Sequence, residues 1–200
     1  MHRRVFLGGA ALAALSACSA AEVWAPEAQV AAATYRGPGP RALTLYTMKS
    51  TQSDNGAHSG LLIDASQRVL FDPAGSFAHP SIPERNDVLF GFSPRVEDYY
   101  VSYHARETFY VIGQRIVVPA ETAEMALRLA LANGPVPQGF CSRATSALLR
   151  QLPGFESIGV TFLPNNLADD FGRLPGVESQ TFRETDADDN SRLRGAAVQL

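Results

Sequence analysis

One cysteine in the chain stands where a nucleophile could be activated. Cys141 follows a loop that contains prolines and a glycine, and it begins a stretch in which apolar residues recur with helical period. At the start of a helix, unpaired backbone N–H groups and the positive end of the helix dipole favour a thiolate over a thiol. The sequence therefore predicts that Cys141 is a nucleophile.

His58 and Asp72 are the candidate base and the candidate orienting acid. His58 begins an apolar stretch over residues 58–64, and Asp72 ends a second one over residues 68–72. A short turn separates them, so we expect a hairpin in which the start of one strand lies beside the end of the other. A carboxylate on one ring nitrogen fixes the histidine tautomer and leaves the other nitrogen to take a proton from a thiol.

His79 and His104 are alternative bases. His79 lies in an irregular segment, and His104 ends an aromatic run that starts at Tyr99. Neither has a nearby carboxylate on a clear pair of strands, so we rank both below His58, with His104 the better substitute. The histidines lack the spacing of metal ligands and no cysteine pair is present, so the sequence predicts no metal and no other cofactor.

The first twenty residues resemble a bacterial export signal. A basic start, His2-Arg3-Arg4, precedes an apolar stretch over residues 5–15 that is too short to cross a bilayer comfortably. Leu15-Ser16-Ala17-Cys18 then resembles the lipobox of bacterial lipoproteins, which implies a signal peptide over 1–17 and a lipid on Cys18. The paired arginines also resemble a twin-arginine motif, and an ordinary signal peptide is the alternative.

This interpretation bears directly on Cys141. The chain has two cysteines, and if Cys18 carries lipid then Cys141 is a lone thiol in an oxidising compartment. The alternative is a buried cysteine that acts as a small apolar residue. We expect a lipoprotein anchored in the periplasm of a bacterium, with the outer membrane favoured. Its expected partners are the membrane, through the lipid, and an envelope substrate.

Length and composition favour one folded domain. The chain has 200 residues, of which 46% are hydrophobic, and a net charge of −3 without a basic stripe, so nucleic acid is not an expected partner. Residues 18–40 are rich in alanine, proline and glycine and are expected to form a flexible linker. The domain is expected over 41–179, and the polar segment 180–200 is expected to be a disordered tail.

The pattern of elements predicts an α+β fold in which an antiparallel sheet packs against a few helices. Strands are expected over residues 41–47, 58–64, 68–72, 87–92, 107–118 and 158–163. Helices are expected over 121–132 and from Cys141 onward, and a short helical turn is expected within 163–171.

Two motifs carry a resemblance to a known superfamily. His58-Ser59-Gly60-Leu61-Leu62-Ile63 and Phe140-Cys141-Ser142 resemble motifs of the circularly permuted branch of the papain-like superfamily, as does Leu163-Pro164-Asn165-Asn166-Leu167. This branch is similar to peptidoglycan-cleaving cysteine peptidases and includes relatives of lecithin:retinol acyltransferase. The resemblance covers about residues 41–170. It implies a permuted papain-like fold with the nucleophile at a helix N-terminus.

The resemblance also implies a chemistry. Cys141 and His58 would act on an amide or ester through a thioester, and Asp72 takes the third position by its place alone, because that position is often Glu, His or another polar residue in the family. A second similarity is to periplasmic transacylases that modify lipoproteins. Whether water or an amine accepts the acyl group stays open. So do two other functions, a non-catalytic lipoprotein that binds an envelope ligand or partner and a redox-responsive lipoprotein.

Overall fold

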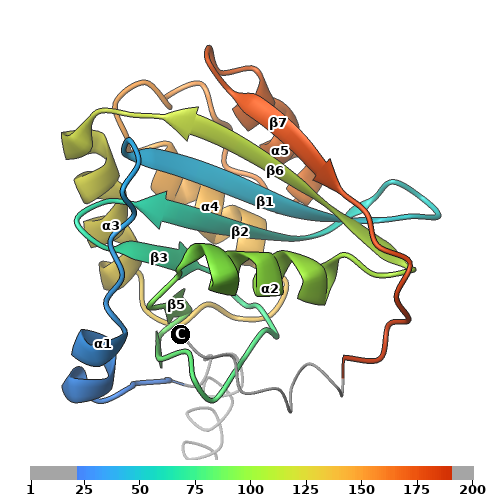
Figure 1. Ribbon diagram of the computed structural model, residues 1–200. Coiled ribbons are helices and arrows are strands. Elements are labelled where there is room, and N and C mark those ends of the chain that lie inside the picture. The colour runs from blue at the N-terminus through green and yellow to red at the C-terminus, as the bar shows by residue number, and fades with distance from the viewer. Residues whose placement is uncertain (1–21, 191–200) are drawn as a thin grey trace, which may run out of the picture.

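The computed structural model describes residues 22–190, which form a seven-stranded antiparallel sheet and five helices (Figure 1). The order of strands in the sheet is β4-β5-β3-β2-β1-β6-β7. The strands are β1 (Ala42–Ser50), β2 (Gly56–Asp64), β3 (Arg68–Phe71), β4 (Glu84–Arg85), β5 (Val88–Leu89), β6 (Phe109–Val117) and β7 (Glu178–Phe182). The helices are α1 (Glu27–Ala33), α2 (Pro94–His104), α3 (Ala120–Ala132), α4 (Cys141–Leu149) and α5 (Pro164–Gly172). The predicted α+β class is confirmed.

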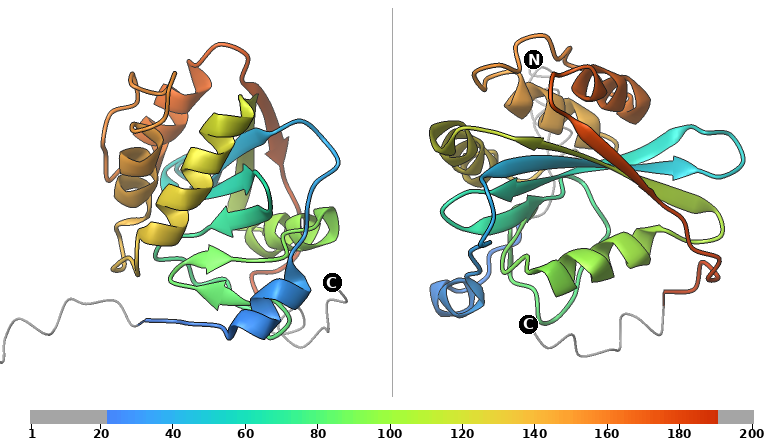
Figure 2. Two further views of the ribbon diagram at one scale, coloured as in Figure 1. Left: turned by 90° about the vertical axis from the view of Figure 1, so that its left-hand side faces the viewer. Right: turned by 45° about the horizontal axis from the view of Figure 1, so that its top comes forward.

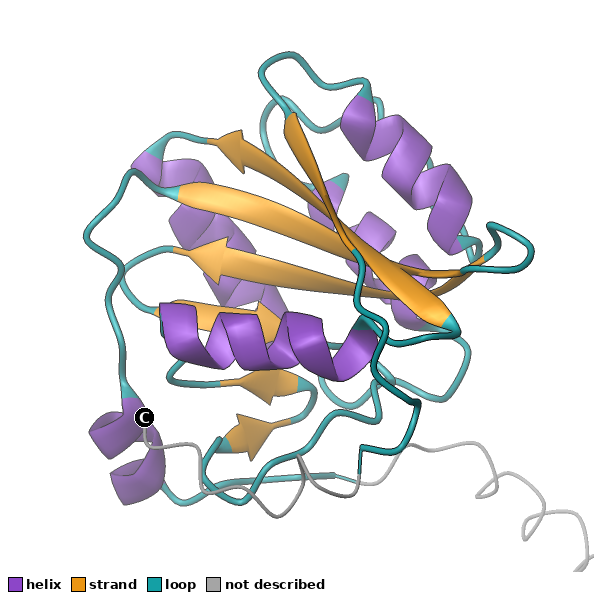
Figure 3. Cartoon of the chain, turned by 45° about the vertical axis from the view of Figure 1, so that its right-hand side comes forward, coloured by secondary structure: helices purple, strands orange, loops and turns teal. Residues whose placement is uncertain are grey.

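The two faces of the sheet are covered differently. Helices α3, α4 and α5 lie on one face and α2 lies on the other, as Figure 2 and Figure 3 show. Because side chains alternate along a strand, Leu61 and Ile63 of β2 pack under α3–α5, whereas Leu62 packs on the side of α2. We call the cluster under α3–α5 the aliphatic layer and the cluster under α2 the aromatic layer.

The aliphatic layer holds the central strands against the helices. Its buried residues include Leu43 and Leu61 from the sheet, Leu148 and Leu149 from α4, and Phe171 from α5. The aromatic layer is richer in rings and is built around Phe77, Phe92 and the tyrosines of α2 and β1. Each layer therefore positions a different part of the chain on the same sheet.

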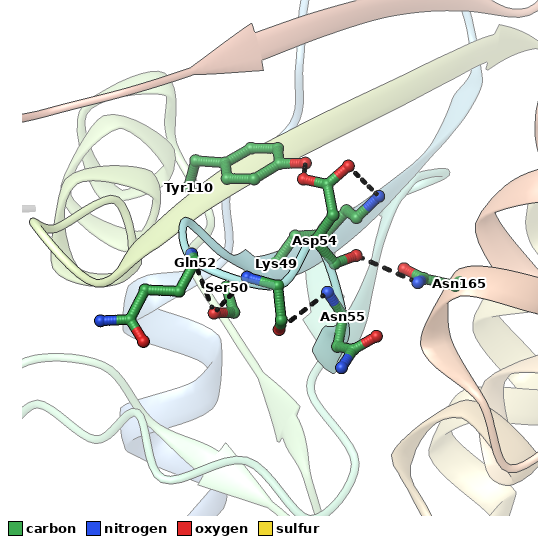
Figure 4. Close-up of polar contacts among 8 residues, drawn as sticks. Lys49, Ser50, Gln52, Asp54, Asn55, Tyr110 and Asn165 are labelled. Carbon is green, nitrogen blue, oxygen red and sulfur yellow. Dashed lines mark hydrogen bonds and ion pairs between the residues drawn. The ribbon is translucent and has the colours of Figure 1, made fainter.

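Strand β2 forms antiparallel hairpins with both of its neighbours. Its pairing with β3 runs from Leu61 opposite Phe71 to Asp64 opposite Arg68, so the predicted hairpin is confirmed. Hydrogen bonds from two sides hold the turn between β1 and β2 (Figure 4). Tyr110 donates a hydrogen bond of 2.5 Å to Asp54, and Asn165 at the start of α5 donates one of 3.1 Å to the Asp54 carbonyl.

The unequal lengths of β2 and β3 leave an opening in the sheet. Strand β2 has nine residues and β3 has four, and their pairing ends where Leu61 meets Phe71. The backbone of β2 from Gly56 to Gly60 therefore has no strand partner on that side, although it stays paired with β1 on the other. An unpaired strand edge needs other hydrogen-bond partners. The start of α4 packs against β2.

Helix α2 was not predicted from the sequence. The run from Tyr99 to His104 lies inside it, and its buried residues Val96, Tyr100 and Tyr103 follow helical spacing. Ser93 caps the helix by accepting a hydrogen bond from the Val96 N–H, with Pro94 in the first turn. Aromatic and β-branched residues lower helix propensity, and here packing in the aromatic layer outweighs that preference.

The predicted flexible linker is wrong for residues 22–40. The backbone of Val23 and Ala25 is hydrogen bonded to Asn86 and Glu84, so this segment runs along the edge of the sheet at β4. Helix α1 then places Val30 in the aliphatic layer. The folded body therefore begins well before residue 41. The predicted signal peptide over 1–17 and the proposed lipid site at Cys18 lie outside the described residues.

Two further expectations fail towards the C-terminus. Residues 178–182 form β7 on the edge of β6, and residues 184–190 are hydrogen bonded to the end of α2 and the loop before β6, so the disordered tail is wrong as far as residue 190. Residues 158–163 do not form a strand. The N–H groups of Gly159 and Thr161 bond the side chains of Asp170 and Ser146 instead of a neighbouring strand. Of the expected strand over 87–92, only Val88–Leu89 pairs.

Within residues 22–190 no helix has the length and apolar character needed to cross a membrane.

Candidate active site

His58 and Asp72 meet at the open end of the β2–β3 hairpin. His58 Nε2 lies 2.8 Å from Asp72 Oδ1, and the side chains are 16% and 3% exposed. Residue 72 follows the last residue of β3, and His58 lies near the start of β2, so the antiparallel pairing brings the two together. The sequence placed them as neighbours for this reason, and the structure brings them together.

Cys141 is the first residue of α4 and reaches the same place from the other face of the sheet. Its side chain is buried, and it lies close enough to His58 for that ring to lower the pKa of the thiol. Because Nε2 of the ring is occupied by Asp72, Nδ1 is the nitrogen left for the thiol. The three predicted side chains therefore lie in one series, Cys141–His58–Asp72, in which His58 bonds Asp72 and lies next to the thiol.

The sulfur of Cys141 lies at the opening in the sheet beside β3. Ser59 lies on the part of β2 that has no partner strand on this side, and its backbone lies close enough to Cys141 to help lower the pKa of the thiol. On the α4 side, the Ser59 and Ser142 hydroxyls lie 2.8 Å apart, and Ser142 Oγ is 3.8 Å from the Cys141 sulfur. The start of α4 is thus fixed to β2 by a serine pair that is fully buried.

The surroundings shift the proton from sulfur to imidazole. Burial by itself lowers the pKa of His58, but the charge and hydrogen bond of Asp72, followed by Cys141, outweigh it and raise this pKa to about 10. Burial by itself raises the pKa of Cys141, but the hydrogen bond and charge of His58, with smaller contributions from Ser142 and Ser59, lower it below the ordinary value of a thiol. Both shifts favour the thiolate–imidazolium form of the pair over the neutral form.

Tyr100 of α2 supports the carboxylate, and the sequence did not reveal it. Its phenol donates a hydrogen bond of 2.7 Å to Asp72 Oδ1. Burial, followed by the charge of Asp72, raises the pKa of Tyr100 well above 10, so the phenol stays protonated and remains a donor. A Cβ at Gly60 would lie 2.7 Å from this hydroxyl and 3.0 Å from Asp72 Oδ1, so glycine gives the two groups room to meet.

The surroundings of His104 make it a poorer candidate base than His58. Its ring stacks on His58 with 6.3 Å between centroids, and its Nδ1 lies 2.8 Å from the Tyr100 carbonyl, to which it can only donate. Burial lowers the pKa of His104 to about 4, so it is neutral near pH 7. His79 is buried against Tyr99, where its Nδ1 accepts a hydrogen bond from the Ser81 N–H. His58 is the histidine that lowers the pKa of the thiol.

A cavity of about 440 Å³ opens beside His58. It lies between the start of β2, the end of α2 and the loop before α4, and its lining includes Ala57, His104 and Gln138. On the other side of the helix start, Phe140 and Phe162 are exposed and their rings meet at 5.2 Å. The cavity therefore opens beside His58, and an exposed aromatic pair lies at Phe140, next to Cys141.

Among residues 22–190, no group of three or more histidines, cysteines or acids is arranged to hold a metal ion. Cys141 is a free cysteine.

No protein-family model, curated protein or solved structure matches the chain.

Proposed function

We propose that the protein is a thiol hydrolase or acyltransferase that opens an amide or ester through a thioester on Cys141. The observation that carries this proposal is the buried series Cys141–His58–Asp72 with its shifted pKa values. A thiolate held next to an imidazolium, with a carboxylate on the far side of the ring, has the parts needed for nucleophilic acyl transfer.

The first step would be attack of the Cys141 thiolate on a substrate carbonyl. The first backbone hydrogen bond of α4 runs from Ala144 N–H to the Phe140 carbonyl, so the N–H groups of residues 141–143 come before the helical ladder. These groups, at the positive end of the helix, are the candidates to stabilise the oxyanion.

The imidazole would then carry the proton through the reaction. The His58 imidazolium donates its proton to the leaving amine or alcohol as the tetrahedral intermediate collapses, which leaves a Cys141 thioester and a neutral ring. That ring next accepts a proton from the incoming water, amine or alcohol, which releases the acyl group and restores the ion pair. Asp72 keeps the ring oriented in both steps.

The motif resemblance supports two further parts of the proposal. A strand that begins with the base and a later helix that begins with the nucleophile are the order expected of a circularly permuted papain-like enzyme. The lipobox-like Leu15-Ser16-Ala17-Cys18 supports action in the cell envelope on a peptide, lipid or lipoprotein.

The proposal is tested by the pH dependence of Cys141 alkylation. In a full chain with Cys18→Ser, Cys141 is the only thiol, and iodoacetamide should react with it well below the ordinary thiol pKa of about 8.5. His58→Ala should move the profile up in pH, whereas His79→Ala, the same change at a histidine outside the series, should leave it in place. A thiol that titrates at its ordinary value, or is inert, would reject the enzyme and favour the non-catalytic alternative.

The thioester itself can be observed directly. Incubation with a p-nitrophenyl ester should add the acyl mass to Cys141, and His58→Ala should abolish the addition. Release by water alone identifies a hydrolase, and release only on addition of a primary amine or an alcohol identifies a transferase.

A further inference from the structure

The cavity beside His58 contains a buried arginine with unused donors. Arg106 lines this cavity and is 7% exposed. Its Nη1 bonds Asp186 Oδ2 at 3.2 Å, but Nε and Nη2 have no hydrogen-bond partner among residues 22–190. Buried donors are almost always paired in native proteins, and a guanidinium cannot lose its charge to relieve the mismatch. An unpaired, buried edge of this kind therefore calls for a ligand.

The two unpaired nitrogens lie on the same edge of the planar guanidinium. Nε–H and the neighbouring Nη2–H point in parallel, and this edge matches the two oxygens of a carboxylate or phosphate. Arg106 Nη1 is already used by a carboxylate, so the group stays fixed while the Nε–Nη2 edge remains unpaired.

The charges around the cavity leave Arg106 as its main attraction for an anion. His104 is neutral near pH 7, and His58 is paired with Asp72 and Cys141. Asp188 also lines the cavity, but its Oδ1 accepts hydrogen bonds from the Thr108 N–H and hydroxyl.

Asp186 acts as an internal competitor for the arginine. It belongs to residues 183–190, which run past the end of α2 (Figure 1). Its side chain is 70% exposed, so it neutralises Arg106 without filling the cavity.

We propose that this cavity binds an anionic group of the substrate, a carboxylate or a phosphate, on the free edge of Arg106. The assignment of this anion to a substrate rests on the proposed function, whereas the binding of the anion does not. His58 and Arg106 line the same cavity, so a bound anion would hold the rest of its molecule next to the proposed thiolate. Arg106 would then select for charge, and the thiol would supply the chemistry.

Binding is tested on the full Cys141→Ala chain, which cannot form a thioester. Inorganic phosphate, glutarate and the neutral glutaramide are titrated calorimetrically at constant ionic strength. We expect phosphate or glutarate to bind and glutaramide not to bind. Binding of phosphate alone identifies a phosphate source, and binding of glutarate alone identifies a carboxylate source. Binding of neither anion, which would leave water as the partner of the arginine, or equal binding of glutaramide, overturns the inference.

Matched variants separate recognition from folding. Arg106→Gln should weaken anion binding about tenfold or more, as expected for loss of a charged hydrogen-bond donor, and Arg128→Gln on the exposed side of α3 should not. Asp186→Asn keeps Arg106 and removes its competitor, so it should tighten binding several-fold even if Arg106→Gln fails to fold. Unchanged or weaker binding in Asp186→Asn would contradict the proposal. Anion binding together with an inert Cys141 would reject the proposed enzyme and leave this site standing.

Discussion

The two layers of the molecule use the same sheet for different purposes. The aliphatic layer contains hydrocarbon side chains and holds α4, so it determines where Cys141 lies. The aromatic layer contains phenols, and beside it the imidazoles and the Asp72 carboxylate determine how Cys141 is charged. Cys141 and His58 come from opposite faces and meet only where β3 ends. Changes in one layer should therefore alter stability, and changes in the other should alter pKa values.

The largest effect is expected in the aliphatic layer. Leu149 is fully buried on α4, and Leu149→Ala should lower the free energy of unfolding by about 2–5 kcal/mol, because it leaves a cavity under the helix. The Cys141 pKa should not change in the protein that remains folded. Leu131→Ala, at an exposed leucine of α3, is the control and should cost far less. Urea unfolding and the alkylation profile measure the two quantities, and a clear shift of the thiol pKa would contradict the division between layers.

Asp72→Asn should change charge more than packing. Loss of the adjacent carboxylate should lower the His58 pKa by about 1–3 units, which NMR titration of the ring would measure. Asp64→Asn, which removes a carboxylate bound to Arg68 at the other end of the hairpin, should leave that pKa unchanged. An unaltered His58 pKa in Asp72→Asn would show that the carboxylate does not support the imidazolium.

The same pair predicts how stability depends on pH. The folded-state pKa of His58 is raised, so its contribution is fully present below the ordinary histidine value of about 6.5 and is lost as the pH rises towards about 10. The lowered pKa of Cys141 acts in the opposite direction, so the measurement needs a Cys141→Ala background. Unfolding free energies in that background should still fall as the pH rises above about 6.5, over a narrower window because Cys141 no longer helps to raise the His58 pKa, and Asp72→Asn should flatten the fall.

Tyr100→Phe should have a smaller effect, confined to the acid side. A hydrogen bond to a charged group contributes about 1.5–3 kcal/mol, and its loss should raise the Asp72 pKa. That pKa is held below its ordinary value, so stability from Asp72 is present at higher pH and is lost as the pH falls through the folded-state value. The loss should begin at a higher pH in Tyr100→Phe. Tyr46→Phe, whose phenol bonds Glu97, is the control and should not move this transition.

The smallest effect is expected for His104→Gln. The ring is neutral near pH 7 and its Nδ1 donates to a backbone carbonyl, so its loss removes no charge from the site. The rate of Cys141 alkylation at neutral pH should change by no more than about fivefold, since a single neutral hydrogen bond is worth only about 1 kcal/mol. A decrease in the alkylation rate as large as that in His58→Ala would show that His104 contributes to the base. It would contradict the choice of His58 over His104.

The sequence revealed the aliphatic layer better than the aromatic one. Apolar residues at helical spacing predicted α3 and α4, and alternation predicted the β2–β3 hairpin, because these patterns reflect burial on one side. Helix α2 was missed because its tyrosines also suit a strand. Ser93-Pro94 with Glu97 in the first turn is the capping signal that could have revealed it.

The candidate site was only partly visible for related reasons. Cys141, His58 and Asp72 could be placed from strand order and the start of a helix. Tyr100 could not, because its contact with Asp72 depends on how α2 packs across the sheet. Nor could Arg106, since a sequence does not tell which arginine is buried with unpaired donors. The docking of residues 22–40 was missed because it uses backbone hydrogen bonds, which any side chains can accompany.

The serine pair that joins β2 to α4 also has a consequence for folding kinetics. Ser59 and Ser142 are 83 residues apart, so their contact closes a long loop and must follow the slow assembly of non-local structure. Until that loop closes, the thiol has the acidity of an unfolded chain. During refolding in mildly acidic buffer, rapid alkylation should therefore appear only after the sheet has formed. The alkylation rate of Cys141 then reports when the contact between β2 and α4 forms.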